Sequence, residues 1–180
     1  MKSLVDQLGQ YAVYHRDSRN IASHLIGIPL IVVAVATLLA RPALGVAGAL
    51  SVSPAMLLAA AAAVFYLRLD IRFGILMTLL LALSVWAGKL LAMQTTGVWL
   101  ACGLGLFFIG WVIQFIGHYF EGSKPAFVDD VIGLAVGPLF IVAELAFFLG
   151  LRDSVRRAIE ERAGPIHGGA GKRADKRAAR

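Results

Sequence analysis

The chain has 180 residues, of which 59% are hydrophobic, with a mean hydropathy of +0.78 and a formal net charge of +6. A water-soluble domain of this size has too little interior to cover that much apolar surface, so the composition indicates an integral membrane protein. The single cysteine, Cys102, excludes an intrachain disulfide and a metal site built from cysteines.

The first 20 residues are polar and contain no apolar core of the length that a signal peptide needs, so we expect no cleavable signal. Leu4, Leu8, Tyr11 and His15 recur at helical spacing within this segment. The pattern predicts a short amphipathic N-terminal helix, which either lies on the membrane surface or docks on the rest of the protein.

Four later segments, residues 21–40, 73–93, 98–120 and 131–151, are apolar over about 20 residues, the helical length that crosses a hydrocarbon core of roughly 30 Å. A fifth segment, residues 54–67, is shorter. A membrane-spanning sheet is excluded because the alternating pattern of a membrane barrel is absent, and an open sheet would leave backbone groups unpaired in lipid. The predicted fold class is all-α: a polytopic transmembrane helical bundle with four to five hydrophobic segments.

The C-terminal residues 152–180 differ in composition, with nine basic and four acidic residues. Glycine and proline at residues 163–165 and 168–171 interrupt any helix. We therefore predict one membrane-embedded helical domain over residues 1–151, followed by a disordered basic tail. Such a tail typically marks the cytoplasmic side and attracts anionic membrane lipid, and we predict no nucleic-acid partner.

The side of the membrane on which the tail lies is ambiguous. Five crossings place the end of the fourth segment on the same side as the start of the first, and the positive-inside rule makes that side cytoplasmic. The same number of crossings puts the tail on the opposite side. Either one segment does not cross, or residues 131–151 bend back at Pro138, where a backbone hydrogen bond is lost. The sequence leaves the number of crossings open.

Three of the four histidines stand at the polar margins of hydrophobic segments: His15, His24 and His118. Imidazole is the commonest protein ligand for a transition metal, and five crossings put all three on one side of the membrane. Residues 17–20 supply helix-capping types, so a corner there brings the first two imidazoles together. Asp17 and Asn20 are then placed to hydrogen-bond the second ring nitrogens. A membrane metalloenzyme is therefore the leading hypothesis.

Three more polar residues are candidate catalytic residues: Gln114, Glu121 and Glu144. Gln114 and Glu121 share a helical face with His118. Gln114 is placed to orient a ligand or bind substrate, and Glu121 either binds the metal or holds a ligand in place. Glu144 lies inside the last hydrophobic segment, where a carboxylate is costly unless it is paired or protonated. It belongs either to the functional site or to a structural hydrogen bond between helices.

Three motifs carry a resemblance: YHxxxxNxxxHxIGIP at residues 14–29, WxxQFIGHxxEGxKPA at residues 111–126, and GPLF followed by a glutamate at residues 137–144. Over roughly residues 4–150, the sequence resembles the iron-dependent 2-hydroxy-fatty-acid dioxygenases. These are small integral membrane proteins whose fungal members act in phytosphingosine breakdown at the endoplasmic reticulum. The resemblance implies O₂-dependent removal of one carbon from a long-chain 2-hydroxy fatty acid, with Fe(II) held by His15, His24 and His118.

The residues are consistent with the implied chemistry. Three neutral imidazoles leave Fe(II) open positions for O₂ and for the carboxylate and 2-hydroxyl of the acid. Loss of the carbon as CO₂ releases four electrons, which fully reduces O₂ without an oxidised co-substrate. Arg16, Arg19 and Lys124 are expected to attract the substrate carboxylate. We expect a multi-pass protein of the inner membrane in a bacterium or of the endoplasmic reticulum in a eukaryote, with the site on the cytoplasmic face; the oligomeric state stays open.

Other classes of function give different expectations. A proton-coupled membrane transporter or a non-catalytic membrane scaffold would use Glu144 and Gln114 as a polar path, but it gives no reason for histidines gathered at one face. A di-iron desaturase needs more histidines than the four present, one of which, His167, lies in the tail. A haem protein would use His24 and His118 as axial ligands and would show a Soret band.

Overall fold

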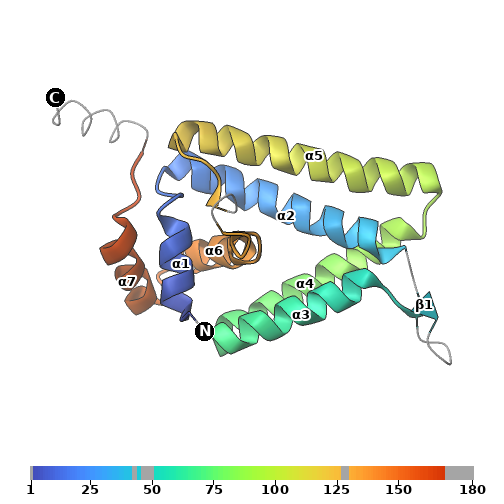
Figure 1. Ribbon diagram of the computed structural model, residues 1–180, viewed down its shortest axis with the longest axis horizontal. Helices are drawn as coiled ribbons and strands as arrows, with labels where there is room; N and C mark the ends of the chain where they lie inside the picture. The colour runs from blue at the N-terminus through green and yellow to red at the C-terminus, as the bar shows by residue number, and fades with distance from the viewer. Residues whose placement is uncertain (1, 42–43, 46–50, 127–129, 169–180) are drawn as a thin grey trace. The chain divides into compact units, whose positions relative to one another are not determined.

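Helices make up nearly all of the regular structure, which confirms the all-α prediction (Figure 1). The computed structural model describes residues 2–41, 44–45, 51–126 and 130–168. A two-residue antiparallel pair joins β1 (Leu44–Gly45) to β2 (Ser51–Val52). The helices in the described ranges are α1 (Leu4–Ala12), α2 (Ser18–Ala40), α3 (Pro54–Leu69), α4 (Ile71–Ala92), α5 (Thr96–Glu121), α6 (Gly133–Phe148) and α7 (Asp153–Ala163).

Three of these helices, α2, α4 and α5, are long and apolar enough to cross a membrane. Helix α3 has 16 residues and is shorter. Helix α6 also has 16 residues, fewer than the sequence predicted for its segment, and it counts as a fourth span only when joined to α7 across a bend of 116°. The five apolar helices α2 to α6 correspond to the predicted hydrophobic segments.

The contacts divide the chain into two compact units. One unit contains Met1–Ile26 and Val112–Arg180, and the other contains Gly27–Trp111. The first unit therefore holds α1, α6, α7, the N-terminal turns of α2 and the C-terminal turns of α5. All the predicted site residues belong to this unit.

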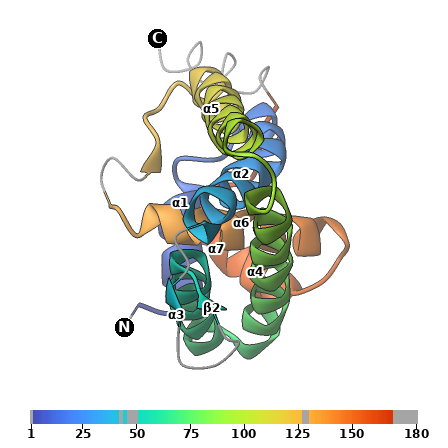
Figure 2. The ribbon, with the colours of Figure 1, turned by 90° about the vertical axis from the view of Figure 1, so that its right-hand side faces the viewer.

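Helix α1 docks on the other helices of the first unit and does not lie apart from them. It begins with a capping box, in which the backbone N–H of Asp6 donates to Ser3 Oγ and the backbone N–H of Ser3 donates to Asp6 Oδ2. Its apolar stripe, which includes Leu8 and Tyr11, is buried. Helix α1 contacts both α6 and α7, as the two ribbon views show (Figures 1 and 2). The structure thus favours the docked form of the predicted amphipathic helix.

Part of the segment predicted to be a disordered tail is helical. Helix α7 covers Asp153–Ala163, buries Ile159 and ends at Gly164, whose φ of 79° lies in the region that favours glycine. Arg162 Nη1 on α7 lies 2.6 Å from Asp6 Oδ1 on α1. Residues 169–180, the remainder of the predicted tail, lie outside the described residues.

The second unit contains a tight helical hairpin of α3 and α4, which lie side by side in both ribbon views (Figures 1 and 2). Asp70 ends α3 and caps α4, because its carboxylate accepts a hydrogen bond of 3.0 Å from the backbone N–H of Phe73. A Cβ atom at Gly74 would lie 2.6 Å from Leu67 Cα, so only glycine fits this close approach. Helix α4 exposes large apolar side chains such as Leu83 and Trp86, as expected for a surface that faces lipid.

Candidate metal centre

Three imidazoles meet in the interior of the first unit. His15 follows α1, His24 lies on the second turn of α2, and His118 lies near the end of α5. One ring nitrogen of each lies within 4.8 Å of one ring nitrogen of the others, and all three side chains are buried. The ring centroids are 4.5 to 5.0 Å apart, with the planes edge to face. The convergence that the sequence predicted is therefore present.

A corner between α1 and α2 brings the first two histidines together. Backbone hydrogen bonds from the N–H of Tyr14 to the Tyr11 carbonyl and from the N–H of His15 to the Ala12 carbonyl form a turn at the end of α1. Asp17 then caps α2, since its carboxylate accepts from the backbone N–H of Arg19 at 2.9 Å. The chain reverses within a few residues, and His24 faces back toward His15.

Close packing of α2 against α5 brings the third histidine to the same point. A Cβ atom at Gly117 would lie 2.6 Å from Asn20 Oδ1 and would collide with Ser23 Oγ. Only glycine permits this approach of the two helices.

The hydrogen bonds of two histidines determine which of their ring nitrogens carries a proton. Nδ1 of His15 lies 2.8 Å from the carbonyl oxygen of Tyr11, and Nδ1 of His24 lies 2.9 Å from the carbonyl oxygen of Asn20. A carbonyl only accepts, so each Nδ1 carries the hydrogen. Burial, followed by the neighbouring His24, holds the pKa of His15 well below its usual range, so this ring is neutral. Each Nε2 atom is left with a lone pair.

These two Nε2 lone pairs face each other across 3.0 Å. Two acceptors at this distance repel unless a cation lies beside both, and Nδ1–H bonded to a carbonyl is the usual arrangement of a metal-binding histidine. The buried Nδ1 of His118 has no hydrogen-bond partner among the described residues, and the same is true of Gln114 Oε1 one turn earlier on α5. The donor set therefore fits a divalent transition metal such as iron, held by neutral imidazoles.

Glu121 supports the loop beside the cluster. Its Oε2 accepts hydrogen bonds from the backbone N–H of Arg16 at 3.0 Å, the backbone N–H of Asp17 at 2.7 Å and the side-chain amide of Asn20 at 3.2 Å. The carboxylate is buried, and Glu121 does not belong to the group of residues whose atoms converge in the described chain. Of the two roles that the sequence left open, the contacts favour holding the ligand loop in place.

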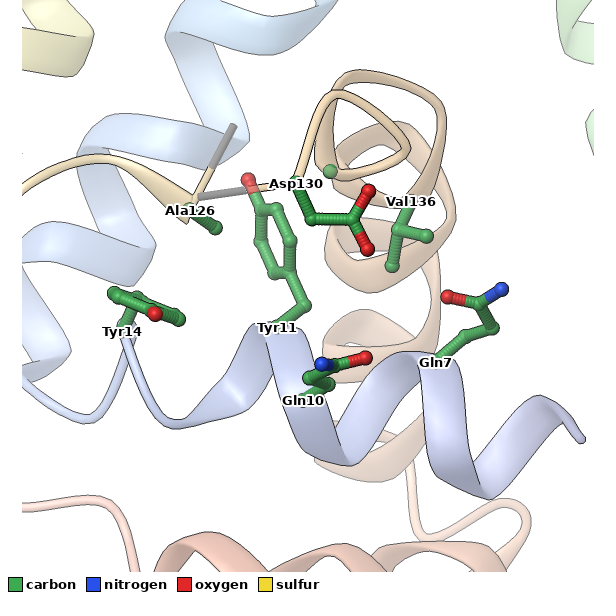
Figure 3. A pocket seen from close by; sticks show the side chains of 8 residues that line it. Gln7, Gln10, Tyr11, Tyr14, Ala126, Asp130 and Val136 are labelled. Carbon is green, nitrogen blue, oxygen red and sulfur yellow. The ribbon is translucent and has the colours of Figure 1, made fainter. Parts of the chain in front are cut away.

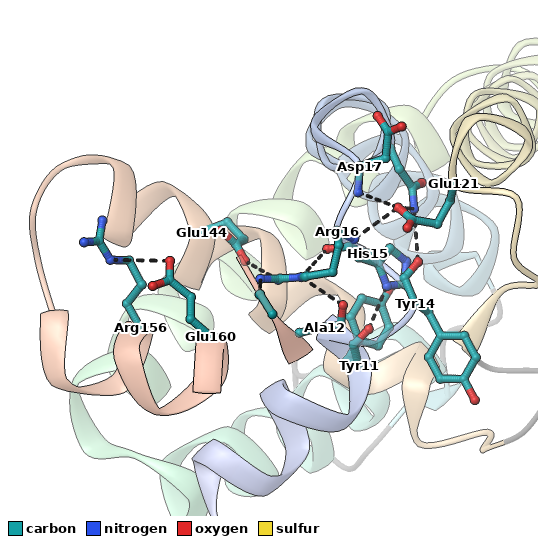
Figure 4. A network of polar contacts seen from close by, with 12 residues as sticks. Tyr11, Ala12, Tyr14, His15, Arg16, Asp17, Glu121, Glu144, Arg156 and Glu160 are labelled. Carbon is teal, nitrogen blue, oxygen red and sulfur yellow. Dashed lines mark hydrogen bonds and ion pairs between the residues drawn. The ribbon is translucent and has the colours of Figure 1, made fainter. Parts of the chain in front are cut away.

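Arg16 and Glu144 form a buried ion pair of 3.1 Å (Figure 4). The Arg16 guanidinium also donates to three backbone carbonyls, those of Ala12, His15 and Gly164. Glu144 is therefore paired within the protein, which agrees with the structural role that the sequence offered as one of two alternatives. Arg16, which we expected to attract substrate, is 5% exposed and points into the protein.

The other predicted residues lie at the edge of this site. The Asp17 carboxylate is bonded to Arg19, whose hydrogen bonds hold the pKa of Asp17 below its usual value. Nδ1 of His15 bonds to the Tyr11 carbonyl and not to a predicted side chain, whereas Asn20 reaches Nδ1 of His24 through its carbonyl and bonds Glu121 through its side-chain amide. The Arg19 guanidinium lies 4.4 Å from the ring centroid of Phe120, and Lys124 is exposed.

Tyr11 is a site residue that the sequence indicated only as part of an apolar stripe. Its ring stacks on His15 with centroids 4.1 Å apart and planes 4° from parallel. It also lines a cavity of about 190 Å³ with Gln7, Gln10, Tyr14 and Asp130 (Figure 3). Stacking gives no pattern in a sequence, because any buried aromatic residue at helical spacing looks the same.

The fold and this centre define an all-helical protein that has membrane-length helices and a buried cluster of three histidines. The chain belongs to the family described as 2-hydroxy-palmitic acid dioxygenase Mpo1-like, whose model matches residues 1–149. The 2-hydroxy-palmitic acid dioxygenase MPO1 of Saccharomyces cerevisiae is 33% identical to it over 159 residues, which are 87% of each chain. No solved structure matches the chain. The resemblance drawn from the three motifs is thereby confirmed.

Proposed function

We propose that this protein is an Fe(II)-dependent dioxygenase that removes one carbon from long-chain 2-hydroxy fatty acids. The observation that carries the proposal is the pair of Nε2 lone pairs of His15 and His24, which face each other beside His118 in a buried centre. The proposal also draws on the family, since the yeast relative is a 2-hydroxy-palmitic acid dioxygenase by name. The overall reaction is 2-hydroxy acid plus O₂ to the acid one carbon shorter, CO₂ and H₂O, which balances without a co-substrate.

His15, His24 and His118 would hold the iron, which supplies redox chemistry and open positions for a chelating carboxylate and 2-hydroxyl. The rest of the site keeps these imidazoles neutral and oriented. The carbonyls of Tyr11 and Asn20 fix the hydrogen on Nδ1, and the stacked Tyr11 ring fixes the plane of His15. Glu121 holds the loop that follows His15.

The remaining side chains act on the substrate. Gln114 Oε1, buried and without a hydrogen-bond partner within the described chain, accepts a hydrogen bond from a substrate hydroxyl. Arg19 and Lys124 attract the carboxylate as it arrives at the membrane boundary, and the acyl tail stays among the apolar helices. Arg16 and Glu144 act on the site through the loop and α6 and do not contact substrate.

Metal analysis and oxygen uptake test the proposal. Protein purified without oxygen should contain about one iron per chain, and alanine at His15, His24 or His118 should deplete it. His167→Ala is the matched control, because it removes the fourth histidine and should leave the iron unchanged. Iron-loaded protein should consume O₂ with 2-hydroxypalmitate and release an acid one carbon shorter. Full iron in all three variants would refute the centre. Iron without oxygen uptake would refute the reaction and favour a transporter or scaffold.

A further inference from the structure

The chain's C-terminal part reaches back to the loop that carries His15. The backbone N–H of His167 donates to the Arg16 carbonyl at 2.9 Å, and the backbone N–H of Ser18 donates to the His167 carbonyl at 3.0 Å. Asp17 and His167 thereby form a parallel β-bridge. Residues 164–168, named here the C-terminal clasp, lie beyond residue 149, where the match to the family ends.

Contacts of α7 and of Gly164 hold the first residue of the clasp in place. Helix α7 precedes it, buries Ile159 and pairs Arg162 with Asp6 on α1. The chain then turns at Gly164, whose carbonyl accepts a hydrogen bond of 3.1 Å from Arg16 Nη1. The clasp therefore contacts both the main chain and the side chain of the residue that follows His15.

These contacts satisfy backbone polar groups in the loop and at the start of α2. The N–H of Ser18 is one of the first N–H groups of α2, which have no acceptor within the helix. The clasp supplies a carbonyl for it. The Arg16 peptide is then held from two sides, with its N–H bonded to Glu121 on α5 and its carbonyl bonded to His167.

We infer that the peptide group of His167 is a positioning group for the metal centre: the clasp holds residues 16–18 so that His15 Nε2 stays directed at the ion. The inference rests on the proposed function, since it concerns the affinity and geometry of the metal held by the three histidines. His15 is the one member of the cluster that does not lie on a helix, so its position depends on the loop. Groups that orient metal ligands from outside typically change metal affinity by roughly 10- to 100-fold.

Two proline substitutions and their alanine controls test the clasp. Ser18→Pro and His167→Pro each remove one N–H donor of the bridge, whereas Ser18→Ala and His167→Ala keep both main-chain bonds. Proline is well tolerated at the first residue of a helix, so Ser18→Pro should fold. Each full-length, metal-free protein in detergent is titrated with Co(II), and its visible absorption is recorded. We expect roughly tenfold weaker Co(II) binding and an altered spectrum for both proline variants, with both alanine variants like the wild type.

The outcomes separate this inference from the proposed function. Wild-type protein that binds no Co(II) would refute the metal centre and the inference together. Tight wild-type binding with the same affinity and spectrum in the proline variants would refute the clasp alone. Equal weakening in His167→Ala and His167→Pro would assign the effect to the imidazole and also overturn it. A lowered melting temperature with an unchanged Co(II) spectrum would show a merely structural contact.

Discussion

At the scale of single residues, we expect Glu121 to hold the loop beside the proposed metal centre and not to bind the metal itself. Its carboxylate accepts from two backbone N–H groups and one side-chain amide in the loop after His15. Glu121→Ala should lower the free energy of unfolding by about 2–3 kcal/mol, because buried donors lose a charged acceptor. It should also lower the iron content. Glu121→Gln should fall between alanine and wild type, since its amide oxygen still accepts.

The Co(II) spectrum is the control for this prediction. If Glu121 acts only through the loop, metal that still binds to either variant should give the wild-type spectrum at lower affinity. A spectrum that shows a lost carboxylate ligand, with stability unchanged, would contradict the positioning role and make Glu121 a ligand.

The residues of the site divide into those that a sequence reveals and those that only packing reveals. His15, His24 and His118 could be found because imidazoles at the ends of apolar segments need an explanation. The partners of their Nδ1 atoms could not, because a main-chain carbonyl leaves no residue-type signal. The partner of Arg16 was also hidden, since its pairing with Glu144 depends on how α6 packs.

At the scale of helices, Gly117 controls how closely α2 approaches α5. A methyl group there meets Ser23 Oγ and Asn20 Oδ1, so Gly117→Ala should cost about 1–3 kcal/mol of stability and weaken metal binding. Gly105→Ala on the same helix is the matched control, because a Cβ there meets no described atom within 4 Å. Its stability and Co(II) affinity, measured in parallel, should not fall. Equal metal affinity in both variants would show that the close approach is not needed for the site.

The pairing of α1 with α7 should depend on pH. Hydrogen bonds from Ser3 and then from Arg162 hold the pKa of Asp6 well below its ordinary value of 3.8. A carboxyl with a lowered pKa stabilises the folded state above that ordinary value, and the contribution is lost as the pH falls further. The melting temperature of wild-type protein should therefore fall more between pH 6 and pH 3 than that of Asp6→Asn.

Arg162→Ala separates the two contributions to this pH dependence, because it removes the ion pair and leaves the capping box. It should lose part of the dependence, whereas Glu161→Gln, an exposed change on α7, should retain all of it. An identical pH response in wild type and Asp6→Asn would contradict the assignment.

The helices themselves were predictable where composition was uniform and less so where it changed. The predicted segments 21–40, 73–93 and 98–120 are mostly apolar over about 20 residues, so length and composition alone located α2, α4 and α5. Helix α7 was missed because its basic residues were grouped with the glycine-rich stretch after it. Its own signals, Asp153 in the first turn and glycine after the last residue, are ordinary helix boundaries.

At the scale of the whole molecule, the membrane-length helices predict which residues lie on opposite sides of the membrane. Helix α2 has 23 residues, or a length of about 34 Å, which is enough to cross a bilayer. Its N-terminal turns belong to the unit of the metal centre, and Arg41 at its other end donates to the Gln94 carbonyl at 3.0 Å. Helix α5, with 26 residues, joins residue 94 to residue 124, so these two residues lie on opposite sides if α5 crosses as well.

Single cysteines at these two positions test that arrangement. In a Cys102→Ser background, Lys124→Cys and Gln94→Cys should react with a membrane-impermeant maleimide from opposite sides of sealed vesicles. Both replaced residues are exposed, so burial should not limit the reaction. We expect the cysteine at 124 on the cytoplasmic side, because the basic residues of the short flanking segments gather there. Labelling of both positions from one side would show that α5, the helix between them, does not cross, and the three histidines would then need another explanation for their place beside apolar helices.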